Sequence, residues 1–376
     1  MKPLCFIPWT SIDIDPQGSI SPCCKFKASR KEKSNILKDT IKEYTKSKFL
    51  KDIKDKMLQN DWPDGCIRCK SEEENNIKSK RQLDYERWQA HFDNYTVDKG
   101  YIIATIAFGN TCNLKCITCH ADTSSRWRQE YKDIYGLDFK PIETISANAD
   151  EIYNEMPNVI HFEVPGGEPL LSDVQKQKML LKRYIESGQS KNISLHYTTN
   201  AQLFPDKEWW NIWSNFKEID MQLSIDGIGR RYEYIRYPAK NELIEKHVMM
   251  YNESLNKYPN LKISVSHTIS AYNIYYLDDF FDWCEFYNLP RPWCGAVHDP
   301  SHMRPTVYPK SINEKIVNHL NKSRHEDVRT WAKYLENNNN SEHYQMFLSM
   351  KQAHDTYRNL NFADTFSQVQ ELIDGV

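Results

Sequence analysis

The sequence predicts an α/β protein whose parallel sheet forms an open, partial barrel, preceded by a small cysteine-rich unit. From about residue 100 onward, six apolar, β-prone segments recur, and helix-length amphipathic segments separate most of them. Strands that alternate with helices in this way form parallel sheets. Eight of the ten cysteines lie within the first 119 residues. Because six strand–helix units are too few to close an eight-stranded barrel, we expect the barrel to stay open.

Composition limits the classes of protein that the chain can belong to. With 376 residues, of which 40% are hydrophobic, it can bury a substantial core in one large domain or two ordinary ones. A net charge of −2 argues against a nucleic-acid-binding protein. We expect no membrane span, because no apolar run approaches about 18 residues. The first residues lack the pattern of a signal peptide, so we expect a cytoplasmic location, where clustered cysteines more often bind metals than form disulfides.

Residues 1–75 are expected to form the cysteine-rich unit. The alternation in "SIDID", a Pro-Gln-Gly turn and "SIS" predict a short hairpin. A helical stretch follows, roughly at 36–59, and "DWPDGCIRC" then places Cys66 and Cys69 in a Pro/Gly turn. The segment 25–56 holds twelve Lys/Arg and five Asp/Glu, which suits either a solvated helix surface or an anion-binding face.

The rest of the chain divides into three parts. A charged linker is expected at 76–99, the partial barrel at 100–305 and a polar, helical extension at 306–376, in which "ENNNNSEH" marks a loop. The six barrel strands are expected at 101–108, 158–164, 193–199, 219–225, 262–269 and 292–297.

Unusual residues follow the first four of these strands. Three closely spaced cysteines come after the first strand, "PGGEP" (165–169) after the second, "TTN" (198–200) ends the third and "SIDG" (224–227) ends the fourth. The carboxyl ends of parallel barrel strands meet at one rim, where such folds carry their chemistry. We therefore expect these segments to converge although they are distant in sequence.

The three cysteines after the first strand are Cys112, Cys116 and Cys119, spaced C-x3-C-x2-C. They can hold three corners of a four-iron cluster, one thiolate per iron. The fourth iron would then lack a protein ligand, as the metal of a catalytic zinc site does, and could chelate a small molecule through an amine and a carboxylate. The alternatives are a structural zinc site with a distant fourth ligand, or buried thiols without a metal.

The "PGGEP" segment is either a tight turn or part of this site. Gly166 and Gly167 would let a ligand approach the backbone, and Glu168 could neutralise an ammonium group.

Four further cysteines suggest a second site. Cys5 and Cys23 lie in a C-x12-G-x4-C pattern, and Cys66 and Cys69 in C-x2-C. The predicted hairpin brings the first pair together, and the helical stretch returns the chain to bring in the second pair. Four thiolates would form a closed site for zinc or for a [4Fe–4S] cluster, which spacing alone does not separate. Cys24 remains an alternative to Cys23 as a ligand.

Residues 100 to about 300 resemble the radical S-adenosylmethionine (radical SAM) superfamily. The three-cysteine spacing and the GGEP motif at 166–169 match its signatures, and "TTNAQL" and "SIDG" are similar to its third- and fourth-strand endings. One departure is Thr118, since the residue before the last cysteine is usually aromatic. The resemblance implies that several residues bind S-adenosylmethionine, either at its amine or at its ribose or carboxylate. They are Gly166, Gly167, Glu168, Asn200, Ser224 and Asp226, and less strongly Arg236.

The same resemblance implies a reaction and its partners. One electron from the reduced open cluster cleaves S-adenosylmethionine to methionine and a 5′-deoxyadenosyl radical, which abstracts hydrogen from a substrate. A reductant such as flavodoxin or ferredoxin would supply the electron. No residue stands out as a general acid or base: His267 and Tyr232 are expected in the core or on the surface. Cys284 and Cys294, outside both cysteine groups, are expected to be packing residues.

Residues 1–75 resemble the Twitch and SPASM auxiliary-cluster domains of radical SAM enzymes, whose signature is C-x(9–15)-G-x4-C followed by C-x2-C. This resemblance favours an iron–sulfur cluster over zinc at Cys5, Cys23, Cys66 and Cys69, with electron transfer as its expected role. The departure is position, because these domains usually follow the barrel.

Three functions remain as hypotheses. Twitch and SPASM proteins are enriched in peptide maturases, so the first is a radical enzyme acting on a peptide or peptide-like substrate. The second is the same chemistry on a sugar, nucleotide or amino acid. The third is a zinc-stabilised binding module without radical chemistry. The sequence does not indicate the oligomeric state.

Overall fold

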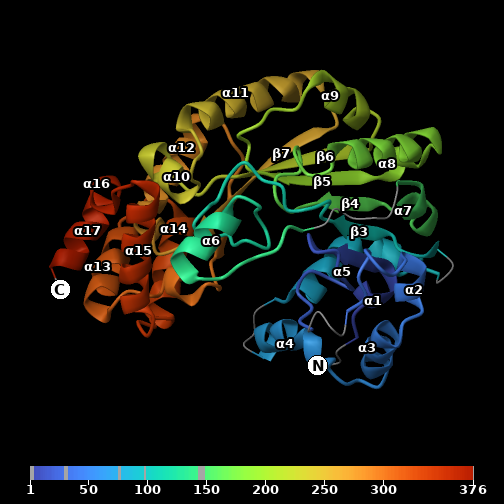
Figure 1. Cartoon of the computed structure of the whole chain (residues 1–376), viewed down its shortest axis with the longest axis horizontal. Helices are drawn as coiled ribbons and strands as arrows, with labels where there is room; N and C mark the ends of the chain where they lie inside the picture. The colour runs from blue at the N-terminus through green and yellow to red at the C-terminus, as the bar shows by residue number, and fades with distance from the viewer. Residues whose placement is uncertain (1–3, 29–32, 75–77, 97–98, 143–148, 376) are drawn as a thin grey trace. The chain divides into compact units, whose positions relative to one another are not determined.

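The structure of the chain, a computed structural model, describes residues 4–28, 33–74, 78–96, 99–142 and 149–375. Its strands follow the order β2-β1-β3-β4-β5-β6-β7-β8 in one sheet (Figure 1). Their bounds are β1 Ser11–Ile14, β2 Ile20–Ser21, β3 Ile103–Ile106, β4 His161–Val164, β5 Ser194–Thr199, β6 Glu218–Ser224, β7 Leu261–Ile269 and β8 Trp293–Ala296. All six strands expected beyond residue 100 are present as β3 to β8, which confirms the α/β class. The edges are β2 and β8, as an open sheet requires.

The chain folds as two compact units. The first unit comprises 1–111, 141–198 and 205–220, and the second unit comprises 112–140, 199–204 and 221–376. This division follows contacts in space, whereas the boundaries expected from the sequence follow composition along the chain and stay a prediction.

In the first unit, the amino-terminal hairpin is part of the main sheet. Strands β1 and β2 pair antiparallel, with Asp13 opposite Ser21, as the turn residues predict. Strand β1 also pairs in parallel with β3, with Ser11 opposite Ile103. Both Ile12 and Ile14 are buried, which explains why this strand adds to the sheet instead of remaining a separate ribbon.

The helical stretch expected at 36–59 is in fact two helices, α2 (Ile41–Thr45) and α3 (Lys48–Leu58). The break has a local cause, because the Ser47 side chain accepts a hydrogen bond from Leu50 N and so caps a new helix. The other helices of the first unit are α1 Ile7–Thr10, α4 Ile67–Glu74, α5 Lys80–Phe92, α7 Ala149–Glu155, α8 Val174–Glu186 and α9 Lys207–Trp213.

The second unit joins β7 and β8, paired in parallel at Ser266 and Trp293, to a helical region. Its helices are α6 Trp127–Tyr135, α10 Gly229–Ile235, α11 Asn241–Lys257, α12 Leu277–Phe286, α13 Lys310–Leu320, α14 Glu326–Asn337, α15 Tyr344–Arg358, α16 Phe362–Thr365 and α17 Ser367–Asp374. Phe347, Phe362 and Phe366 are fully buried and pack their rings against Tyr272. This aromatic cluster packs the carboxyl-terminal extension onto Tyr272, which follows β7.

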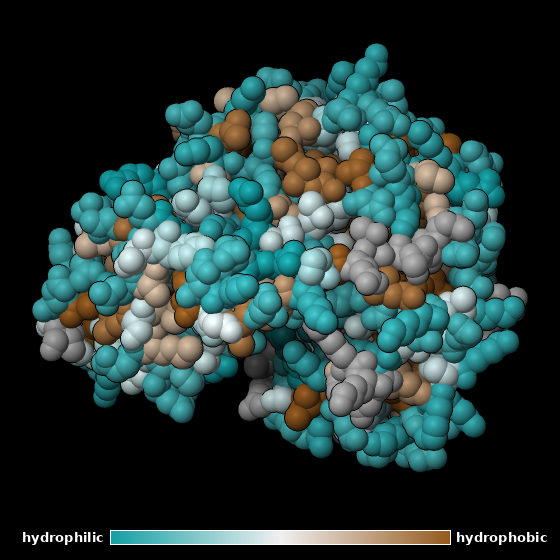
Figure 2. Space-filling model, in the orientation of Figure 1, coloured by the Kyte–Doolittle hydropathy of each residue, from teal (hydrophilic) through white to brown (hydrophobic). Residues whose placement is uncertain are grey.

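Side chains on the face drawn in Figure 2 are mostly hydrophilic, and hydrophobic residues occur there in small groups. Among the residues that the structure describes, no helix combines the length and the apolar character that crossing a bilayer requires.

Candidate functional site

Four cysteines of the first unit line one cavity. Cys5 precedes α1, Cys23 follows β2, Cys66 ends a short 3-10 helix, and Cys69 lies in α4. These are the four residues that the sequence predicted as ligands of the second site. The cavity is also lined by apolar side chains and by the basic and acidic side chains of helix α5, namely Lys80, Arg81 and Asp84.

Two glycines allow these cysteine-bearing segments to meet. Gly18, in the hairpin turn, has a φ of +78°, which a residue with a side chain rarely adopts. At Gly65, an added Cβ would lie 2.3 Å from the ring of Phe26. Lys27 N donates a hydrogen bond to Gly65 O over 2.9 Å, so the turn that carries Cys66 lies directly against the segment that follows Cys23.

The four thiols suit both candidate metals by number and type. Four thiolates can hold either a tetrahedral zinc ion or a four-iron cluster, in which each thiolate binds a different iron. Among the described residues, the three potential ligand atoms that lie within 4.8 Å of one another belong to a group without cysteine.

Electrostatics in the cavity also fits an anionic cluster. Burial raises the pKa of Cys5 and of Cys66 to about 12, and the charge of Arg81 opposes the rise at both. Without a metal, these thiols therefore stay protonated at neutral pH. Ligation by iron would supply the positive charge that ionises them. Arg81 and Lys80 also lie at the cavity, where they pair with Glu73 and Asp84 over 2.5 and 2.7 Å.

Cys24 is exposed and is absent from the cavity lining. Of the two adjacent candidates, the structure thus places Cys23, not Cys24, with the other three thiols. The electrostatic neighbours of Cys24 are Lys80, Asp13 and Glu163.

The three-cysteine loop lies in the second unit, before α6. Cys116 is buried, and Cys112 and Cys119 are partly buried. Leu114 N lies 3.4 Å from Cys112 Sγ, and Cys119 N donates a hydrogen bond to Cys116 O over 2.9 Å. The loop is also fixed to the end of α10, because Ile117 N donates to Ile235 O over 2.8 Å. The backbone is therefore folded around the thiols, as a cluster-binding loop requires.

Two of the other predicted residues lie beside this loop. Asn200 Nδ2 donates to Asn113 Oδ1 over 2.7 Å and lies 3.8 Å from Cys112 Sγ. Arg236 Nη1 lies 4.0 Å from Cys116 Sγ. The Cys116–Cys119 hydrogen bond, together with burial, raises the pKa of Cys116, while the charge of Arg236 opposes the rise.

The two candidates at the end of β6, Ser224 and Asp226, already make contacts with other residues of the second unit. Asp226 is 1% exposed, pairs with Arg236 over 2.9 Å and accepts a hydrogen bond from Thr268 N over 2.8 Å. Its carboxylate therefore balances the arginine next to Cys116. Ser224 is partly exposed and shares a hydrogen bond of 3.2 Å with Ser266. Direct contact of either residue with S-adenosylmethionine stays a prediction.

The GGEP turn, in the first unit, is built around the carbonyl of Thr111, the residue before Cys112 in the chain. Glu168 N and Ser172 Oγ donate to this oxygen over 2.8 and 3.0 Å. Gly166 and Gly167 have φ values of +89° and +50°, and a Cβ on Gly167 would lie 2.4 Å from Thr111 O. Both glycines are therefore required by the backbone conformation, and Gly167 also by the close approach. Glu168 is fully buried.

The residues without an assigned role in the sequence are core residues. His267 is 1% exposed, its Nδ1 lies 2.8 Å from Ile225 O, and burial lowers its pKa to about 4. Tyr232 is fully buried. Burial raises the pKa of Cys284 and Cys294 to about 12, which agrees with packing roles.

Sequence reasoning missed a row of polar residues across the sheet of the first unit. Asp13, Thr105, Glu163 and His196 are paired in register on four neighbouring strands, so their side chains share one face. Thr105 Oγ1 donates to Glu163 Oε2 over 3.1 Å, and His196 Nδ1 lies 2.8 Å from Asp220 Oδ2. The available signal was the polar residue at every second position of "SIDI", "HFEV" and "SLHYTT".

Titratable groups in this row are coupled. Although burial opposes ionisation, the hydrogen bond from His161 lowers the pKa of Glu163 to about 2. Burial also opposes the charge of His196, but the hydrogen bond to Asp220 raises its pKa. At Asp13, burial raises the pKa to about 7. The row therefore contains a fixed carboxylate, an imidazole that binds protons more readily than usual and a carboxyl group that titrates near neutrality.

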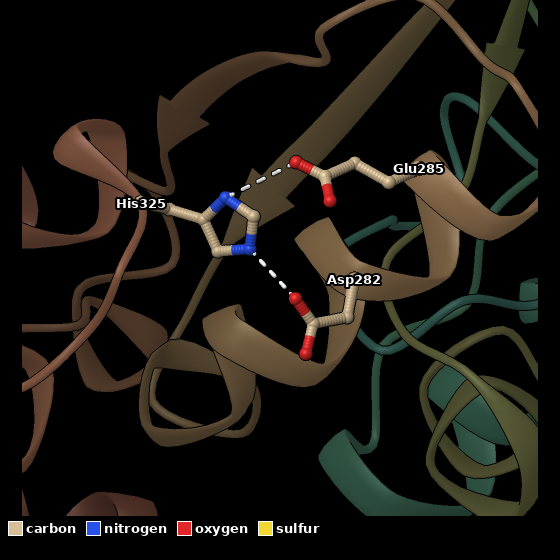
Figure 3. A group of neighbouring side chains, drawn as sticks. All are labelled: Asp282, Glu285 and His325. Carbon is tan, nitrogen blue, oxygen red and sulfur yellow. Dashed lines mark hydrogen bonds and ion pairs between the residues drawn. The ribbon is translucent and has the colours of Figure 1, made fainter.

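A second polar group, in the second unit, consists of Asp282, Glu285 and His325. Its potential ligand atoms lie close enough together to hold a metal ion, but its surroundings favour an ion network. His325 lies between Asp282 and Glu285, 2.7 and 3.6 Å from their oxygens (Figure 3). Arg324 Nη2 bonds to the same two carboxylates over 2.7 and 2.5 Å. Since Arg324 already pairs with both acids, which are more than half exposed, this group is a surface ion network that ties the start of α14 to α12.

Comparisons with known proteins agree with the amino-terminal site. Residues 5–70 match the family model of SPASM, described as an iron–sulfur cluster-binding domain. An uncharacterized protein of Methanocaldococcus jannaschii is 28% identical over 172 residues, which are 46% of this chain and 54% of that protein. The chain thus spans about half the length of this curated relative.

Solved structures give weaker similarities. Native anSMEcpe with bound AdoMet is 17% identical, with a TM-score of 0.43 over 63% of this chain and 62% of the other. SuiB of Streptococcus suis bound to precursor peptide SuiA is 16% identical, with a TM-score of 0.40 over 86% of this chain and 69% of the other. Both TM-scores lie below 0.5, so the family assignment depends on the SPASM match and on the cysteine motifs.

The SPASM match spans Cys5, Cys23, Cys66 and Cys69 and confirms the family predicted for this segment. Residues 5–70 are therefore similar to SPASM-type iron–sulfur domains, and the same chain carries the C-x3-C-x2-C loop, the GGEP turn and a largely parallel sheet.

Proposed function

We propose that the chain cleaves S-adenosylmethionine reductively and uses the resulting 5′-deoxyadenosyl radical to abstract hydrogen from a peptide or peptide-like substrate. One observation supports this most strongly. Three thiols lie on a single loop, and the GGEP turn is hydrogen-bonded to the carbonyl of the residue before the first of them. A zinc-stabilised binding module would not need two glycines with positive φ values beside this loop.

Each group of residues at the three-cysteine loop and the GGEP turn has a separate proposed role. Cys112, Cys116 and Cys119 would hold a four-iron cluster, which, when reduced, supplies one electron to S-adenosylmethionine. Arg236 places a positive charge 4.0 Å from Cys116 Sγ and so stabilises the thiolate form. The buried Glu168 would accept hydrogen bonds from the methionyl ammonium group, and the partly exposed backbone of Gly166 and Gly167 would let that group approach.

The SPASM-type domain would carry electrons. With four thiolates in its cavity, every iron of an auxiliary cluster has a protein ligand, which favours electron transfer over substrate binding. This arrangement is compatible with net oxidation of a substrate. Reductants such as flavodoxin or ferredoxin are the expected electron donors for the first step.

The proposal of a peptide substrate has separate support. Proteins with SPASM-type domains are enriched in peptide maturases, and residues 5–70 match this domain. The polar row places donors and acceptors at roughly 4.8 Å intervals, the distance between neighbouring strands, with Thr105, Glu163 and His196 partly exposed and Asp13 buried at its end. Such a strip suits the repeated polar groups of a peptide.

A measurement of 5′-deoxyadenosine tests the proposed chemistry. Anaerobically purified protein, reduced in the presence of S-adenosylmethionine, should form 5′-deoxyadenosine and methionine. The Cys112→Ala/Cys116→Ala/Cys119→Ala variant should form neither and should lose about half of the roughly eight irons per chain. Cleavage that survives this triple substitution would exclude the loop as the site.

A second assay separates the substrate classes. Extract from cells that make this protein should stimulate formation of 5′-deoxyadenosine. If the substrate is a peptide, prior digestion of the extract with protease should remove the stimulation. A small-molecule substrate would survive digestion and pass through a 3-kDa filter, on the order of the mass of about 25 residues.

A further inference from the structure

A buried ion network connects the carboxyl-terminal extension to the three-cysteine loop. At its centre is Glu130 of α6, which is fully buried. Its carboxylate accepts a hydrogen bond from Arg358 Nε over 2.8 Å, lies 3.0 Å from His354 Nδ1 and pairs with Lys115 Nζ over 2.6 Å. Figure 1 shows the three segments together, with α6 beside α15. Residues more than 220 positions apart in sequence thus share one carboxylate.

Lys115 is part of the cluster-binding loop, between Cys112 and Cys116. Its backbone N donates to Tyr237 O over 2.7 Å, so both its backbone and its side chain are held. The neighbouring turn is tied to α6 as well, because Trp127 Nε1 donates to Cys116 O over 2.9 Å. A movement of α6 would therefore move the backbone of a ligand.

Arg358, the last residue of α15, completes the network. Its guanidinium lies over the ring of Trp127 at 4.7 Å and over that of Tyr237 at 5.2 Å. Within the described part of the chain, its Nη1 and Nη2 have no hydrogen-bond partner, and the side chain has no exposed surface. Its charge is therefore stabilised by Glu130 and by two aromatic faces that are themselves attached to the loop.

Two buried cations share one anion in this network. Although burial opposes ionisation, the hydrogen bond from His354 and the charges of Arg358 and Lys115 lower the pKa of Glu130 to about 2. Burial lowers the pKa of His354, which therefore stays neutral near pH 7. Arg358 and Lys115 thus place positive charge beneath the loop, where it would stabilise the added electron of a reduced cluster.

We propose that Arg358 and His354 of α15 are positioning residues, which act through Glu130 on Lys115 to hold the three-cysteine loop in the shape that binds an iron–sulfur cluster. This inference depends on the proposed function, because it assumes that the loop binds a cluster. It gives the carboxyl-terminal extension a role in cluster retention and in setting the reduction potential.

Two substitutions test the inference on the full chain. Arg358→Met removes the charge but keeps an apolar side chain of similar length, and Arg358→Lys restores a charge without the planar fork. Arg324→Met is the matched control, because it removes an arginine that also bonds to carboxylates of the second unit, but at the surface. All variants are prepared anaerobically, and the SPASM-type site serves as an internal control for folding.

Cluster retention is measured as the rate at which iron is released to a chelator. Electron paramagnetic resonance spectra of the reduced protein show which of the two sites loses its cluster. We expect Arg358→Met to speed iron loss from the three-cysteine loop at least tenfold and to lower its reduction potential, with iron at the SPASM-type site unchanged. Arg358→Lys should restore much of the retention, and Arg324→Met should match the wild type.

The outcomes separate this inference from the proposed function. If wild-type protein holds iron at the loop and Arg358→Met retains it as firmly and at the same potential, the positioning role is wrong. If wild-type protein holds no iron at the loop, the proposed function itself fails. If Arg358→Met does not fold, the double variant Glu130→Gln/Arg358→Met takes its place, because it removes both members of the ion pair together. A rate of iron release from the double variant equal to that of the wild type would also contradict the inference.

Discussion

Replacing Glu130 with glutamine should destabilise the second unit strongly. The substitution keeps the shape of the side chain but leaves the buried Arg358 and the partly buried Lys115 without this counter-charge. Removing one partner of a buried ion pair costs about 3–5 kcal/mol. The pKa gives an independent value: a decrease from 4.5 to about 2 corresponds to about 3 kcal/mol at 1.36 kcal/mol per unit. Both routes therefore predict a loss of about 3 kcal/mol.

The loss is measurable by urea denaturation, followed through the fluorescence of tryptophans such as Trp127. With a slope of about 3 kcal/mol/M, the midpoint should fall by about 1 M. The pKa of Glu130 is lower in the folded state, so its stabilising effect is present above about pH 4.5 and is lost as pH falls towards 2. The difference from wild type should therefore be constant between pH 6 and pH 8.

Glu285→Gln is the matched control for this prediction. Glu285 also accepts from an arginine, but its side chain is 57% exposed, and surface pairs contribute about 1 kcal/mol or less. If Glu130→Gln shifts the midpoint no more than Glu285→Gln does, the buried network does not have the energetic role that we derive from it.

Three further predictions concern the two sites. Gly167→Ala should weaken S-adenosylmethionine binding at least tenfold in equilibrium dialysis, because its Cβ would lie 2.4 Å from Thr111 O at a φ of +50°; wild-type affinity would contradict the assigned turn. Cys66→Ala/Cys69→Ala should lose about half of the iron and stop turnover of the true substrate, yet still cleave S-adenosylmethionine; full iron content would exclude these ligands. Asp13→Asn should raise the free energy of unfolding more at pH 8 than at pH 5. Burial raises the pKa of Asp13 from 3.8 to about 7, so ionisation of this carboxyl group opposes folding above about pH 4. An equal effect of the substitution at both pH values would refute this.

The sequence predicted those features that depend on local patterns. Cys5, Cys23, Cys66 and Cys69 meet in one cavity because a hairpin and a C-x2-C turn are both short-range signals. The strands β3 to β8 follow from apolar segments of strand length. The two glycines of the GGEP turn also have positive φ values, as a close backbone approach requires.

Features that depend on tertiary contacts were not predictable. The pairing of β1 with β3 joins residues about 90 positions apart, and nothing in "SIDID" specifies that partner. The polar row emerges only when four strands are placed in register. Glu130, His354 and Arg358 look like ordinary polar helix residues in the sequence, and only the fold shows that they share one buried site.

The most direct test of the central claim is the electron paramagnetic resonance spectrum of the reduced Cys66→Ala/Cys69→Ala variant, recorded with and without S-adenosylmethionine. In this variant, the amino-terminal cavity keeps only Cys5 and Cys23 of its four thiols, so the loop with Cys112, Cys116 and Cys119 is the candidate cluster site that keeps all of its ligands. We predict a four-iron signal that changes when S-adenosylmethionine is added, because its amine and carboxylate bind the iron without a protein ligand. A signal that does not respond to S-adenosylmethionine, or zinc in place of iron at these thiols, would contradict the account.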